Sequence, residues 1–100
     1  MEQVHVEIQY IDDCPNTAPL IERTRQAILK VKRNVDLKLI HIRDNDTARE
    51  LHFRGSPTLL INGEDYWGME LPEQPALACR FFPDGLPSVG QIRQRLIDIP

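Results

Sequence analysis

Two cysteines, Cys14 and Cys79, are the residues of this 100-residue chain whose type points most directly to chemistry. A thiolate is a nucleophile and a ligand for soft metal ions. Cys14 comes shortly before a predicted helix, whose free N–H groups and positive dipole end would lower the pKa of its thiol. Asp12 and Asp13 would raise that pKa. We therefore predict a reactive thiol at Cys14 with a mildly lowered pKa; the alternative is an inert, half-buried cysteine.

Two further residues are candidates to assist Cys14. Cys79 lies in a long irregular segment, so it could approach Cys14 as a resolving thiol, or it could pack as a small apolar residue beside Phe81. Thr17, at the start of the predicted helix, could donate a hydrogen bond to a Cys14 thiolate, and it is also the expected N-cap of that helix. The residue types are compatible with each of these roles.

The histidines do not suggest a metal site. His5, His41 and His52 have no close ligand spacing to one another or to the cysteines, so we expect no zinc centre. The sequence therefore predicts no bound metal and no cofactor. Capture of a soft metal ion by Cys14 and Cys79 is kept as an alternative, because thiolates select soft ions.

The spacing of apolar residues predicts the elements that position these side chains. Strands are indicated by alternation or short apolar runs, and helices by apolar residues on one side of a helical period. In chain order they are a strand over 4–11, a helix over Thr17–Lys32, a strand over Val35–Ile42, a short helix from Thr47 to about Phe53, strands over Thr58–Ile61 and Glu64–Trp67, and a helix over Ser88–Ile97. This β-α-β-α-β-β-α order predicts one α/β domain over residues 1–100, with a four-stranded mixed sheet covered by helices.

Local signals support several of these boundaries. Asn62-Gly63 is typical of a hairpin turn, and Thr47–Glu50 and Ser88–Gln91 match the capping box that opens a helix. Residues 68–87, which are rich in proline, are expected to form an irregular inserted loop of functional or mobile character. Nearby aromatic residues are expected to cover the sheet edge or pack this loop, with a peptide-binding patch as the alternative: Tyr66, Trp67, Phe81 and Phe82.

Composition excludes several classes of partner. The net charge is −3 and no basic stripe is present, which argues against nucleic acid. No apolar stretch is long enough to span a membrane, and the N-terminal residues do not have the pattern of a signal peptide. We therefore expect a cytoplasmic protein whose cysteines are free or transiently bonded rather than permanently paired.

Three short elements carry a resemblance to a known family. Cys14-Pro15-Asn16 follows the first predicted strand, Gly55 to Thr58 precedes the third, and Cys79-Arg80 comes later. Their types and places resemble the thioredoxin-like superfamily, and more narrowly small thioredoxin-like proteins that carry the same elements. The resemblance implies the sheet order 2-1-3-4, with the first and last helices on one face.

The resemblance also implies a binding site around a cis-proline. Pro57 matches the cis-proline that lies beside the nucleophilic cysteine in this family, with the Ser56 backbone turned toward Cys14 and open to an extended substrate. Pro15, Ser56, Pro57 and Thr58 are the substrate-binding residues that this implies.

One departure from the family concerns the second cysteine. The family motif is C-x-x-C, and Thr17 stands at the place of its resolving cysteine. Our leading hypothesis is a thiol–disulfide redox protein in which Cys14 forms a mixed disulfide with a protein or small-thiol substrate. Cys79, or an external thiol such as glutathione, would then complete the exchange. The alternatives are a non-catalytic binding module that keeps the fold, and thiolate binding of a soft metal ion.

Overall fold

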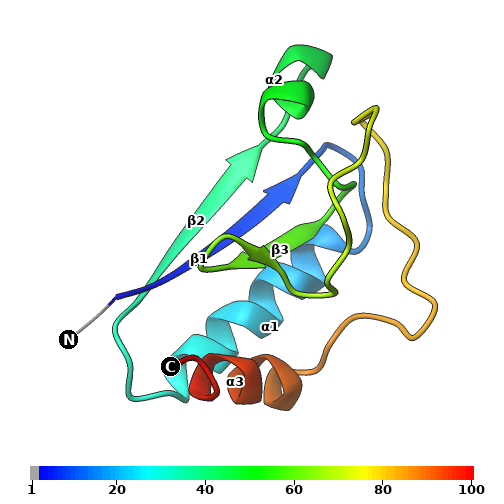
Figure 1. Cartoon of the computed structure of the whole chain (residues 1–100). Helices are drawn as coiled ribbons and strands as arrows, with labels where there is room; N and C mark the ends of the chain where they lie inside the picture. Colours follow the sequence, from blue (N-terminus) through cyan, green and yellow to red (C-terminus); the bar gives the residue numbers. More distant parts are fainter. Residues whose placement is uncertain (1–2) are drawn as a thin grey trace.

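A computed structural model describes residues 3–100, and its elements run β-α-β-α-β-β-α along the chain. The strands are β1 (Val4–Tyr10), β2 (Val35–His41), β3 (Thr58–Ile61) and β4 (Glu64–Asp65), and the helices are α1 (Thr17–Leu29), α2 (Asn45–Glu50) and α3 (Val89–Ile97). The strands form one sheet in the order β2-β1-β3-β4 (Figure 1). The predicted α/β fold with a four-stranded mixed sheet is therefore confirmed.

The central position of β1 determines which loops meet. β1 pairs in parallel with β2 and antiparallel with β3, and Gln9 near the end of β1 faces Thr58 at the start of β3. The loop that leaves β1 and the loop that enters β3 therefore lie at the same end of the sheet, beyond the ends of its two central strands. The first contains Cys14 and the second contains Ser56 and Pro57.

Helices α1 and α3 pack on the same face of the sheet, as predicted (Figure 1). Alternation along β1 buries Val4, Val6 and Ile8 against this layer, as expected for a strand with one face in the core. The helices contribute residues at helical spacing to the same core: Leu20 and Ala27 from α1, and Ile92 and Leu96 from α3. This core supports β1, and the loop that contains Cys14 begins at the end of that strand.

Several elements end earlier than predicted. Helix α1 ends at Leu29 rather than Lys32, because the N–H groups of Lys30 and Val31 bond three residues back and tighten the last turn. β1 and β2 each end one residue earlier than predicted, and β4 stops at Asp65 rather than Trp67. After Asp65 the chain turns away, with the N–H groups of Trp67 and Met69 donating to the Asp65 carboxylate.

The predicted caps are correct for α3 and wrong for α1 and α2. At α3, the Ser88 and Gln91 side chains form the expected capping box. Helix α2 begins at Asn45 because the Asp44 carboxylate accepts the Thr47 N–H at 2.7 Å, so Asp44 rather than Thr47 is the N-cap. Helix α1 has Asn16 at the N-cap position, with no side-chain cap, and Thr17 is its first residue.

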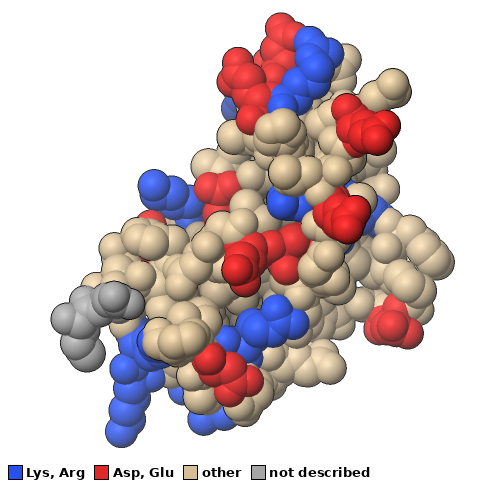
Figure 2. Space-filling model, in the orientation of Figure 1, with Lys and Arg blue, Asp and Glu red and all other residues tan. Residues whose placement is uncertain are grey.

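Between Asp65 and Val89 the structure contains neither a helix nor a strand apart from one isolated bridge, which joins Cys79 to Ser56. This segment crosses the end of the sheet and returns to α3 along the side of the molecule (Figure 1). Acidic and basic side chains are interspersed on the face shown in Figure 2. Among the described residues, 3–100, we find no helix of the length and apolar character that crossing a membrane requires.

Candidate functional site

Cys14 lies in the tight connection between β1 and α1. Its backbone carbonyl accepts the Thr17 N–H at 3.2 Å, and the preceding Asp13 has a positive φ of 60°, so the chain turns sharply just before the cysteine. The Cys14 side chain is turned inward and is only 8% exposed. The Ile11 N–H donates to the Ser56 hydroxyl at 3.0 Å and ties this connection to the loop before β3.

Ser56 and Pro57 form the wall against which Cys14 packs. The Ser56–Pro57 peptide bond is cis, as predicted, and both residues are buried. The Cys14 thiol donates to the Ser56 carbonyl oxygen, with 3.2 Å between Sγ and O. The sheet register therefore brings the two elements named from the sequence into direct contact.

Cys79 reaches the same place from the irregular segment. Residues 78–80, which we call the Cys79 segment, lie along Ser56 in a parallel bridge. The Ser56 N–H donates to the Ala78 carbonyl and the Arg80 N–H donates to the Ser56 carbonyl, both at 2.8 Å. This pairing directs the Cys79 thiol to Cys14, with 2.9 Å between the two sulfurs.

The two thiols differ in their tendency to ionise. Burial raises the pKa of Cys14, but hydrogen bonds from the Cys79 thiol, the Ser56 hydroxyl and the Asn16 backbone outweigh burial and leave the pKa below its ordinary value. The pKa of Cys79 is raised, first because its thiol donates to Cys14, and then by burial and by the charge of Cys14. When the pair loses one proton, the negative charge therefore lies on Cys14 and the remaining proton on Cys79.

Thr17 lies next to this pair in a subsidiary role. Its hydroxyl oxygen is buried and makes no hydrogen bond of ordinary geometry within residues 3–100. Among the groups that lower the Cys14 pKa it has the smallest effect. The Thr17 hydroxyl is thus available to turn toward a Cys14 thiolate.

A buried ion pair fixes the Cys79 segment on its other side. The Arg80 guanidinium lies 2.7 Å from the Asp65 carboxylate, and the two side chains are only 9% and 2% exposed. The same guanidinium stacks over the Trp67 ring, 4.7 Å from its centroid. Arg80 therefore anchors the residue next to Cys79 to the hairpin at the edge of the sheet.

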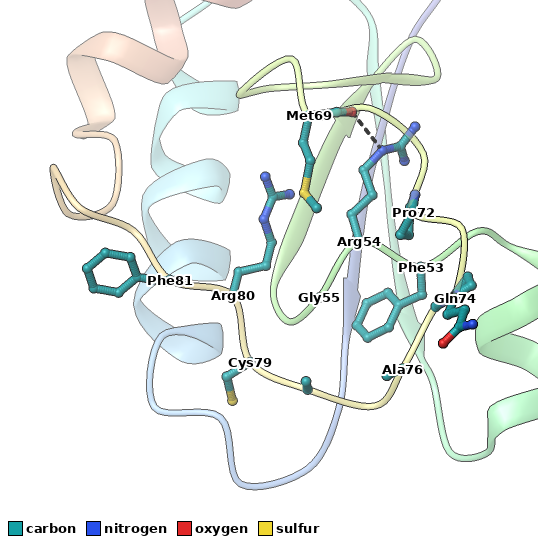
Figure 3. A pocket seen from close by; sticks show the side chains of 12 residues that line it. Phe53, Arg54, Gly55, Met69, Pro72, Gln74, Ala76, Cys79, Arg80 and Phe81 are labelled. Carbon is teal, nitrogen blue, oxygen red and sulfur yellow. Dashed lines mark hydrogen bonds between the residues drawn. The ribbon is translucent and has the colours of Figure 1, made fainter.

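Gly55 makes room for this anchor. It has a positive φ of 104°, and a Cβ built there would overlap Cγ of Arg80. Figure 3 shows the Arg80 side chain passing close to Gly55, while the Cys79 sulfur points away from Arg80 and Met69. A side chain at position 55 would displace Arg80 and, with it, the pairing that directs Cys79.

Sequence reasoning named Cys14, Ser56, Pro57 and Cys79, and the structure brings these four together. It missed Arg80 and Asp65 as positioning residues, because nothing in the spacing of an acidic residue on the predicted hairpin and an arginine next to Cys79 indicates that the two form a pair. Of the three remaining candidates, Thr17 lies beside the pair as described above, and Pro15 and Thr58 lie on either side of the site. Pro15 is exposed beside Cys14. Thr58 is fully buried, with its hydroxyl donating to the Gly55 carbonyl.

Two hollows adjoin the cysteines. One, of about 370 Å³, lies between Gly55 and the loop that carries Cys79 (Figure 3). The other, of about 530 Å³, is open to solvent and is lined by Cys14 and its neighbours Asp12, Asp13, Pro15 and Thr17, with no residue of the Cys79 segment in its lining. Cys14 thus faces Cys79 on one side and a hollow on another.

Comparisons of the chain with models of protein families, with curated proteins and with solved structures gave no match in any of the three.

Proposed function

We propose that this chain is a thioredoxin-like thiol–disulfide redox protein in which Cys14 is the nucleophile and Cys79 is the resolving thiol. The observation that carries the proposal is the 2.9 Å contact between the two sulfurs. It is supported by the lowered pKa of Cys14 and the raised pKa of Cys79, which assign them different roles. The motifs Cys14-Pro15-Asn16 and Gly55 to Thr58, which resemble those of the thioredoxin-like superfamily, agree with it.

The chemistry consists of two exchanges. The Cys14 thiolate attacks one sulfur of a disulfide, so that a mixed disulfide forms on Cys14 and one substrate thiolate leaves. Cys79 then loses its proton to the departing thiolate or to water and attacks the Cys14 sulfur, which releases the second substrate thiolate. The substrate disulfide is reduced to two thiols, and the protein is oxidised to a Cys14–Cys79 disulfide.

Cys79 supplies what the sequence motif lacks. Thr17 occupies the place of the second cysteine in C-x-x-C, and this absence was the main support for a non-catalytic binding module. A second sulfur beside Cys14, delivered by another segment, favours exchange over that alternative.

Peptide mapping after mild oxidation tests the proposal. The reduced chain is treated with one equivalent of diamide, and non-reduced peptides are identified by mass spectrometry. We expect a cross-link between the Cys14 and Cys79 peptides and a loss of two hydrogen masses. With glutathione disulfide, Cys79→Ser should carry a stable glutathione adduct on Cys14, and Cys14→Ser is the matched control. Dimers alone, or no cross-link, would overturn the proposal.

A second candidate is capture of a soft metal ion, which the same pair of adjacent thiols favours. Within residues 3–100, no three potential ligands of the histidine, cysteine and carboxylate types come together, so such an ion would have only the two sulfurs. Titration of the reduced chain with Cu(I) against a competing chelator tests this, with Cys14→Ser as the control.

A further inference from the structure

The backbone of Ser56, beside the cis-proline, is already paired with another part of the same chain. An extended substrate that pairs with Ser56 would need the Ser56 N–H and carbonyl groups. Both groups are bonded to the Cys79 segment, through Ala78 and Arg80, at 2.8 Å. The segment thus occupies the backbone groups that a substrate strand would need, and it places the Cys79 sulfur against Cys14.

Displacing this segment would also require breaking its anchor. The Arg80–Asp65 pair is buried, the Arg80 side chain packs over Trp67, and Gly55 leaves room for it. Removing the segment from Ser56 would leave the Asp65 carboxylate without its partner if that side chain stayed buried, which is costly. An extended polypeptide therefore competes with a segment that is held by two backbone hydrogen bonds and by this ion pair.

The other side of Cys14 is open. The hollow of about 530 Å³ that Cys14 lines contains no residue of the Cys79 segment. A volume in the range of about 300–1,000 Å³ suits a small molecule. This hollow is an approach to Cys14 from solvent that leaves the pairing of Cys79 with Ser56 intact.

We propose that the substrate is a small-molecule disulfide, which enters through the hollow beside Pro15 and Thr17, and not an extended polypeptide. This inference rests on the proposed function. The Cys14 thiolate attacks one substrate sulfur and the other substrate sulfur leaves as a thiolate. Cys79, whose sulfur lies 2.9 Å from that of Cys14 in the reduced chain, then attacks Cys14, gives its proton to the departing thiolate and releases the second thiol.

Two disulfides with the same leaving group test the proposal. One is the mixed disulfide of nitrothiobenzoate with N-acetylcysteine amide, and the other joins nitrothiobenzoate to the central cysteine of a ten-residue unstructured peptide. Release of nitrothiobenzoate is followed by absorbance, and each rate is divided by the rate of the same disulfide with free glutathione. We expect the reduced wild-type chain to react at least ten-fold faster with the small disulfide.

A double variant, Arg80→Ala with Asp65→Ala, tests whether the Cys79 segment causes the preference. It removes the anchor without leaving a lone buried charge. We expect the ratio of small to peptide rates to fall at least three-fold. Arg95→Ala is the matched control, because Arg95, on α3, also stacks on an aromatic ring, that of Tyr66. This variant should keep the wild-type ratio.

The outcomes separate the two proposals. If neither disulfide reacts, the proposed function fails, and this inference fails with it. If both react at equal rates, the function stands and the small-molecule inference is overturned. A folded double variant that keeps the full preference also overturns it. Should that variant not fold, hydrogen exchange of the wild-type chain decides, since loss of protection at the Arg80 amide on adding the peptide would contradict the inference.

Discussion

At the scale of single residues, each cysteine shifts the pKa of the other, so Cys14 ionises before Cys79. The Cys79 thiol is the strongest of the donors that lower the Cys14 pKa against the opposing effect of burial. The Cys14 sulfur is the main reason that the Cys79 pKa is raised. Their titration therefore belongs to the pair, as in other coupled sites.

This coupling predicts shifts in opposite directions. Cys79→Ala removes a donor, so the pKa of Cys14 should rise relative to the lower step of the wild-type chain. Cys14→Ala removes the acceptor and its charge, so the pKa of Cys79 should fall toward that of an ordinary cysteine. Thiolate absorbance near 240 nm as a function of pH measures both, whatever the exposure of the sulfurs. Equal titration in the two single-cysteine variants would contradict the assigned roles.

The acidic residues at the hollow predict a preference for substrate charge. Asp12 and Asp13 line it, and Asp12 is paired with His41 at 2.9 Å. Cystamine, which is cationic, should therefore oxidise the reduced chain about five-fold faster than anionic dithiodipropionate at low ionic strength, after correction for their rates with a free thiol.

Asp13→Asn should reduce this preference, and so should high salt, which screens exposed charges. Glu50→Gln, an exposed acidic residue on α2, is the matched control. A preference that does not respond to Asp13→Asn or to salt would show that these carboxylates do not select the substrate.

At the scale of elements, the burial of the Arg80–Asp65 pair makes it a firm anchor. Removing one partner of a buried pair costs about 3–5 kcal/mol in the free energy of unfolding, because the other charge is left without a partner. We expect Arg80→Met to show a loss in this range in urea unfolding.

The exposed pair Arg49–Asp46 is the matched control, with side chains 62% and 82% exposed. An exposed pair contributes only about 0–1 kcal/mol, so Arg49→Met should be nearly neutral. If both variants lose the same small amount, then Arg80 does not hold the Cys79 segment in place.

The elements themselves could be predicted because their signals are local. Alternation along Val4–Tyr10 and the capping box at Ser88 are local patterns, and both led to the correct element. The end of α1 depended on which carbonyls the N–H groups of Lys30 and Val31 reach, and the start of α2 on Asp44 capping earlier than Thr47. Apolar spacing does not carry either kind of information.

At the scale of the whole molecule, the candidate site combines a predictable half with an unpredictable half. The proximity of Cys14 and Pro57 follows from the order of the strands, because antiparallel pairing of β1 with β3 brings the loop after β1 and the loop before β3 to the same end of the sheet. The position of Cys79 depends on a segment without periodicity, which is held by hydrogen bonds to Ser56 and by a pair between Arg80 and Asp65. Those contacts join distant residues, so no sequence pattern predicts them.

If the proposed function is right, Cys14 and Cys79 form one two-electron couple. Equilibration of the chain with glutathione buffers of varied ratio, followed by acid quenching and mass analysis, tests this. We expect a single transition between the dithiol and the Cys14–Cys79 disulfide, with the slope of a two-electron couple. This transition should be absent from both Cys14→Ser and Cys79→Ser. A wild-type chain that gathers separate glutathione adducts on each cysteine, without an internal disulfide at any ratio, would show that the two cysteines do not form such a couple.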